Sequence, residues 1–61
     1  MVKKHEYVVE RRIARAKLLL RTTTLPVTEI ALRIGCANQQ HFSTLFRRAT
    51  GTTPTAYRAA R

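Results

Sequence analysis

The segment 39–50 gathers amide, hydroxyl, imidazole and guanidinium side chains and contains no carboxylate. At about 100° per residue, Gln40, Thr44 and Arg47 project from one side of a helix. A glutamine amide can form two hydrogen bonds to adenine, a threonine offers a hydroxyl and a methyl group, and an arginine binds guanine or phosphate. The flanking side chains are His41, Ser43 and Arg48. This chemistry favours recognition of base edges in the major groove of DNA.

The opposite side of the same segment is apolar. Four side chains fall within an arc of about 100° and are predicted to face the core: Phe42, Leu45, Phe46 and Ala49. Gln39 projects nearer to this core face than Gln40 does, so we expect it to reach DNA only because it lies at the start of the helix.

Basic side chains continue beyond the base-facing groups. Arg47 and Arg48 lie near the end of the predicted helix and Arg58 follows it. Because the start of a recognition helix enters the groove most deeply, we expect these three to bind phosphate and to position the protein. For Arg61 a solvated chain end is the simpler interpretation.

No pattern for catalysis or metal binding accompanies these residues. His41 has neither an acid nor a nucleophile nearby in sequence, and the second histidine, His5, is far from it. The single cysteine, Cys36, excludes an internal disulfide and is expected to pack as a small apolar side chain. The sequence predicts a protein that is not an enzyme and holds no cofactor or metal.

The charge of the chain points to polyanionic partners. Twelve Lys and Arg against three Asp and Glu give a formal net charge of +9, and the isoelectric point is about 11.5. Charge alone does not separate DNA, RNA and anionic membranes. The basic residues of the first predicted helix spread around it, which argues against membrane binding. No apolar run is longer than three residues, as in Leu18–Leu20, and no signal peptide is recognisable, so we expect a soluble cytoplasmic protein.

Helical periodicity, interrupted by residues that break or cap helices, predicts a small all-α domain occupying residues 1–61. A long helix over 5–22 carries one apolar stripe, Val9, Ile13, Ala16 and Leu20. A second stripe lies about 120° away around the same helix and needs a partner of its own. Its members are Tyr7, Ala14 and Leu18.

A helix-turn-helix is predicted over 26–50. Its first helix begins near Pro26 and buries Val27, Ile30, Ala31 and Ile34, and Gly35 can adopt the left-handed conformation that ends it. Asn38 is expected to cap the recognition helix, 38–50. A short C-terminal helix follows over 53–61, with Thr53 as its cap and Pro54 at its first position, and it carries Tyr57 and the basic residues Arg58 and Arg61.

These residues resemble the C-terminal part of the DNA-binding domain of AraC/XylS-type bacterial transcription regulators. The resemblance runs from Arg12–Leu20 through Pro26–Ala31 and Gly35 to Asn38–Ser43, Phe46–Arg48 and Gly51–Pro54, ending in Tyr57-Arg58. It covers almost the whole chain. The position after Gly35 is usually aromatic in the family and is Cys36 here, which leaves less packing volume in the turn.

The resemblance implies a joining helix and the second of two helix-turn-helix units. The residues that would face bases are Gln39, Gln40, His41, Ser43 and Thr44, with Arg47 and Arg48 near the backbone. It also implies double-stranded DNA as partner, contact with RNA polymerase during activation, and a first helix-turn-helix and an effector-binding domain that this chain does not contain.

Two other interpretations remain open at this stage. The chain could be a protein-interaction module, or a truncated remnant of a larger regulator with little DNA affinity of its own, because one helix-turn-helix makes few phosphate contacts. Self-association through the stripe Tyr7, Ala14 and Leu18 is a further possibility.

Overall fold

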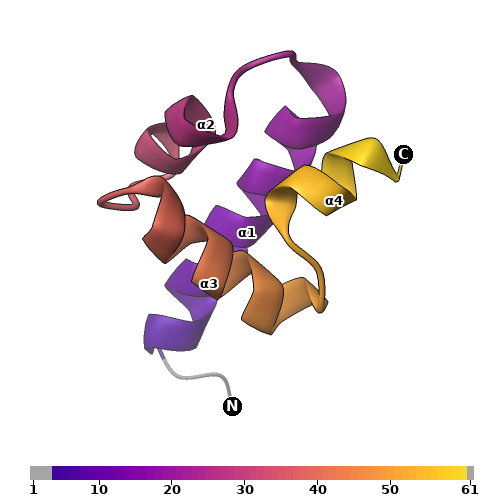
Figure 1. The fold of residues 1–61 in the computed structure, drawn as a ribbon. Helices are drawn as coiled ribbons and strands as arrows, with labels where there is room; N and C mark the ends of the chain where they lie inside the picture. The colour runs from indigo at the N-terminus through magenta and orange to yellow at the C-terminus, as the bar shows by residue number, and fades with distance from the viewer. Residues whose placement is uncertain (1–3, 61) are drawn as a thin grey trace.

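The computed structural model describes residues 4–60, with side chains described from Tyr7 onward, so that Arg61 lies outside the described part. Within that range it contains α1 (Lys4–Thr22), α2 (Val27–Arg33), α3 (Gln39–Thr50) and α4 (Pro54–Ala59), and no strand. The long α1 contacts each of the other three helices (Figure 1). The predicted all-α fold is confirmed, with the helices close to the expected positions.

The core lies between α1, α2 and α3. The predicted stripe of α1 supplies Ile13, Ala16 and Leu20, all buried, and Val9 packs against them at its edge. The predicted face of α2 is buried as well, with Val27 only partly covered. Ala31 is completely buried, so its small side chain lies where the neighbouring helices pack closely. The remaining buried core residues are Ile30, Ile34, Cys36, Phe42 and Phe46.

Three aromatic rings link α3 to α4. Phe42 and Phe46 are completely buried and meet edge to face, with ring centroids 5.7 Å apart. Phe46 makes a second edge-to-face contact with Tyr57 of α4 at 5.4 Å. Because such pairs stabilise beyond their buried area, Phe46 is the side chain that joins the short C-terminal helix to the core.

A Schellman motif ends α2. Gly35 has φ +94°, its N–H donates to the carbonyl of Leu32, and the N–H of Cys36 donates to the carbonyl of Ala31. This places Cys36 in the core, 4% exposed. Pro26 is the residue before α2 and not its first helical residue, and it offers no side-chain cap. The glycine predicted to end α2 does so.

Asn38 caps the start of α3 and Thr53 caps the start of α4, as predicted. The Asn38 side-chain oxygen accepts a hydrogen bond from the His41 N–H at 2.8 Å. Gly51, at φ +81°, ends α3 and donates its N–H to the Arg47 carbonyl. Thr53 accepts from the Ala56 N–H, and Pro54 occupies the first turn of α4. The ends of α3 are therefore fixed.

The prediction that Ala49 faces the core was wrong. Ala49 is exposed, whereas Thr50, its neighbour, is half-buried. In the last turn of α3 the covered side chains are Phe46 and Thr50, and not Ala49. The Thr50 hydroxyl donates to the Phe46 carbonyl. A single methyl group loses little by exposure, so its apolar character did not decide its place.

The end of α1 is tied to α4 by one side chain. The Arg58 guanidinium donates to the carbonyls of Leu20 and Thr23, each at 3.3 Å. These carbonyls lie where the negative end of the helix dipole is concentrated and where no further turn can satisfy them. Arg58 is half-buried in this contact.

We expect Phe46→Leu to lower the free energy of unfolding by about 2 kcal/mol, since it removes both aromatic contacts and leaves unfilled volume. Urea unfolding followed by circular dichroism measures this. Leu18→Ala, at a position 51% exposed, is the control and should change stability by less than about 0.5 kcal/mol. Equal effects of the two changes would contradict the aromatic anchor.

We expect Arg58→Gln to cost about 1–2 kcal/mol of stability, because two charge-assisted hydrogen bonds to the end of α1 are lost. The matched control is Arg48→Gln, which removes the same charge from an exposed position on α3. Thermal or urea unfolding of the two variants side by side gives the comparison. Two equally stable variants would show that Arg58 does not hold α4 on α1.

Candidate nucleic-acid interface

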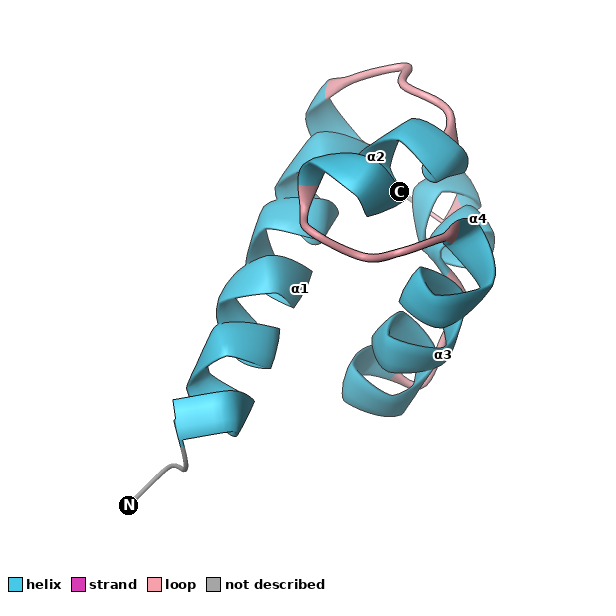
Figure 2. Ribbon diagram, turned by 90° about the vertical axis from the view of Figure 1, so that its left-hand side faces the viewer, coloured by secondary structure: helices cyan, strands magenta, loops and turns pink. Residues whose placement is uncertain are grey.

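The polar face of α3 is determined by its buried face. Phe42 and Phe46 point into the core and towards α1, so the opposite side of α3 points away from the body of the protein. Figure 2 shows α1 and α3 on opposite sides of the molecule, with α2 across the top. The exposed side chains on α3 include Gln39, Gln40, His41, Thr44, Arg47 and Arg48. The structure thus brings six of the eight predicted site residues onto the exposed surface of one helix.

Local hydrogen bonds set the orientation of the first turns. The His41 N–H is bonded to Asn38, and the Thr44 hydroxyl donates to the Gln40 carbonyl at 3.1 Å. This contact uses the hydroxyl proton of Thr44 and leaves its lone pairs and its methyl group for other partners. The amide of Gln40 is left exposed beside it.

Two predicted site residues, Ser43 and Arg58, are not part of this exposed surface. Ser43 is half-buried, so it is less accessible than its neighbours on α3. The guanidinium of Arg58 is bonded to backbone carbonyls of Leu20 and Thr23. This contact could not be predicted from sequence patterns, because it joins residues more than thirty positions apart.

The charged side chains of α3, Arg47 and Arg48, are both positive. All three acids of the chain, Glu6, Glu10 and Glu29, precede α3. Glu29 pairs within α2 with Arg33 at 3.3 Å, so its charge is partly compensated there. Arg47 and Arg48 stand in the last turn of α3, where cations also complement the helix dipole. An anion that approaches α3 meets no carboxylate on that helix.

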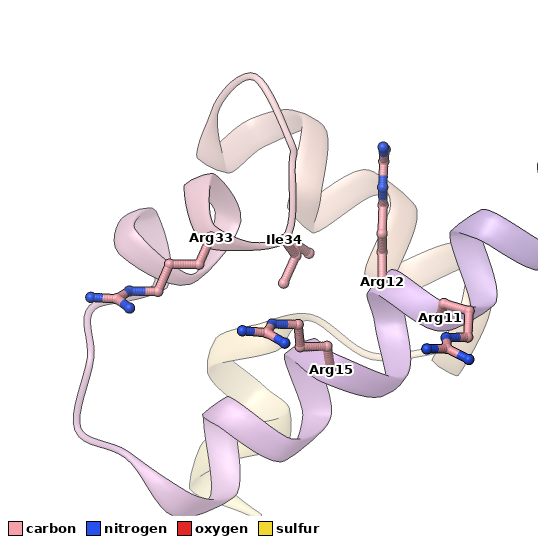
Figure 3. A pocket seen from close by; sticks show the side chains of 5 residues that line it. All are labelled: Arg11, Arg12, Arg15, Arg33 and Ile34. Carbon is pink, nitrogen blue, oxygen red and sulfur yellow. The ribbon is translucent and has the colours of Figure 1, made fainter.

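A second basic cluster was missed by the sequence analysis. Arg11, Arg12 and Arg15 of α1 and Arg33 of α2 line an open hollow of about 380 Å³, with Ile34 as its apolar wall (Figure 3). The basic residues of α1 were interpreted as spread around the helix. Only packing brings Arg33 to them, although the four-residue spacing of Arg11 and Arg15 was a visible signal.

The turn before α3 lies beside this cluster. The Arg12 guanidinium comes within 3.5 Å of the place that a Cβ on Gly35 would occupy. Burial raises the pKa of the neighbouring Cys36 thiol, and the positive charge of Arg12 lowers it by a smaller amount. The thiol is therefore neutral near pH 7 and packs as a small apolar group, as predicted.

The described residues offer no group of three or more His, Cys, Asp or Glu side chains that could hold a metal ion. Among the same residues, no helix combines the length and the apolarity needed to cross a membrane.

The chain matches a known family of proteins in sequence. A helix-turn-helix domain model matches residues 3–60. The regulatory protein SoxS of Salmonella typhimurium is 45% identical over 53 residues, which are 87% of this chain and 50% of that protein. The arabinose operon regulatory protein of Escherichia coli is 40% identical over 50 residues, 82% of this chain and 17% of that protein. The chain thus spans at most about half the length of these relatives.

Solved structures agree with the sequence relatives. The C-terminal domain of AraT, a response regulator from Geobacillus stearothermophilus, matches with a TM-score of 0.96 and 38% identity over 98% of this chain and 50% of that one. The DNA-binding domain of AdpA, a global transcriptional factor solved with a target DNA, matches with a TM-score of 0.92 and 34% identity, over 97% of this chain and 53% of that one. The chain belongs to the AraC/XylS family of helix-turn-helix transcriptional regulators.

Proposed function

We propose that this chain is a DNA-binding module of a bacterial transcription regulator and that it lays α3 in the major groove of double-stranded DNA. The observation that carries the proposal is the exposed, acid-free face of α3, held outward by the burial of Phe42 and Phe46. Amide, hydroxyl and guanidinium groups on a short helix are what a major groove accepts. The AdpA domain, solved with its target DNA, supports this reading.

The side chains of α3 have different roles in this proposal. Gln40 and Thr44 contact base edges, and Gln39 and His41 contribute from the first turn, which enters the groove most deeply. Ser43, half-buried, makes at most a peripheral contact. Arg47 and Arg48 bind phosphate and fix the position of the helix. Arg58 is left out of the phosphate set because its guanidinium already bonds to the backbone of α1.

The module acts with other parts of a regulator. Tyr7 and Leu18 are 54% and 51% exposed on α1, and with Ala14 they form the second apolar stripe. We propose that a first helix-turn-helix unit packs on this stripe, which adds phosphate contacts and raises a specific affinity that one unit alone leaves low. An effector domain, contact with RNA polymerase and a cytoplasmic, nucleoid-associated location belong to the same proposal. The proposed role is non-enzymatic.

We expect Gln40→Ala and Arg47→Ala to change DNA binding in different ways. In a selection of DNA sequences over a salt series, Gln40→Ala relaxes the preference at one base position, at a cost of about 1–3 kcal/mol for the preferred site. Arg47→Ala weakens binding to all sequences and reduces the salt slope by about one unit, because one phosphate contact is lost.

Thr55→Ala, an exposed change on α4, is the control for both variants and should match the wild type. If neither substitution altered preference or affinity, α3 would not be the helix that reads DNA.

We expect the chain by itself to sediment as a monomer. The stripe offers only two large side chains, far short of the roughly 1,000 Å² that a stable interface buries, and a net charge of +9 opposes self-association. Sedimentation velocity over a concentration series tests this. A dimer that Leu18→Lys dissociates would mean that the stripe binds a second copy instead of another unit.

A further inference from the structure

The arginine groove between α1 and α2, formed by Arg11, Arg12, Arg15 and Arg33 around Ile34, is not used by the proposed DNA contact. Arg11, Arg15 and Arg33 are exposed and Arg12 is half-buried. Two of the four side chains have partners among the described residues: Arg11 donates to the Tyr7 hydroxyl at 3.3 Å and lies 5.8 Å from the centroid of its ring, and Arg33 pairs with Glu29. The four positive charges around the hollow repel one another. Such an arrangement is stabilised by an anionic partner.

The arginine groove and the polar face of α3 point in different directions. Arg11 and Arg15 project from the side of α1 remote from its buried stripe Ile13, Ala16 and Leu20, with Arg11 roughly opposite to it. The polar face of α3 points away from α1 on the other side of the molecule (Figure 2). A straight duplex held by α3 is therefore not expected to reach Arg11 and Arg15.

The arrangement of the four side chains fits an extended partner. In Figure 3, Arg15 and Arg33 extend in one direction across the hollow, whereas Arg12 extends along the turn that follows Ile34. Arg11 lies farther along α1, beyond Arg12. Guanidinium groups that fan out in this way cannot all bind one compact phosphate. They match a series of anionic groups spaced along a chain.

The position of the groove favours a protein chain over a nucleic acid, since Arg11 and Arg15 lie away from the polar face of α3 that would hold DNA. The apolar part of its lining is Ile34, which is only 5% exposed, so the guanidinium groups are what a partner would meet. The carboxylates of an acidic peptide pair bidentately with arginine. We propose that the arginine groove docks an acidic segment of a partner protein while α3 holds DNA. This deepens the proposed function, on which it rests, by naming the surface and the chemistry of a protein contact.

Two double variants with the same loss of charge test the proposal. Arg11→Gln with Arg15→Gln empties the groove, and Arg47→Gln with Arg48→Gln removes two charges from α3. Each full-length variant is checked for folding by circular dichroism. Fluorescence anisotropy then measures binding to a labelled peptide that repeats Glu-Glu-Leu, to the same peptide with Gln in place of Glu, and to a labelled DNA duplex.

We expect the groove variant to bind the acidic peptide about fivefold more weakly and DNA within about twofold of the wild type. The α3 variant should show the reverse, and the Gln peptide should bind neither variant nor wild type. Equal loss of peptide binding in both variants would reveal attraction by net charge alone and overturn the proposal. Loss of DNA affinity in the groove variant would do so too, by assigning these arginines to nucleic acid. The peptide measurement contains no DNA, so failure of the chain to bind DNA would contradict the proposed function and leave the groove to be decided separately.

Discussion

The burial of Phe42 and Phe46 is the constraint on which the other features depend. Both rings are completely covered, and they are the largest side chains in a core that few residues build. Rotating α3 about its axis would bring polar groups into that core and lose the edge-to-face contact of Phe46 with Tyr57 of α4. The outward position of Gln40, Thr44 and Arg47 is therefore a consequence of aromatic packing on the inner side.

The polar groups at the described helix ends have hydrogen-bond partners. No buried side-chain nitrogen or oxygen among the described residues lacks a hydrogen-bond partner. Asn38, Thr53 and the two glycines at φ +94° and +81° close four helix ends locally. The end of α1 is closed from a distance by Arg58. In a domain of this size, where the core contributes little surplus stability, each of these contacts is a considerable part of the total.

Features set by neighbours in sequence were predictable, and features set by packing were not. Helical periodicity and the caps at Gly35, Asn38 and Thr53 follow from local rules, and the structure has them where the sequence indicated. Ala49 was misplaced because periodicity does not tell where a covering helix stops. The bond of Arg58 to α1 and the approach of Arg33 to Arg11 and Arg15 depend on how the helices pack, which no single-helix projection contains. Seven of the eight site residues were proposed on one helix. Of the two that are not exposed, Ser43 is half-buried on α3 and Arg58 is bonded to the end of α1.

The short connection between α2 and α3 has a consequence for the kinetics of recognition. The Schellman motif at Gly35 and the cap at Asn38 stand only two residues apart, so both helix ends and the turn between them are hydrogen-bonded before any ligand arrives. The backbone is thus preorganised, and the entropic cost of binding falls on long side chains and on water and counterions instead of on the fold. A helix-turn-helix with such a preorganised backbone can sample many sites along a duplex in rapid succession, since no refolding step separates one encounter from the next.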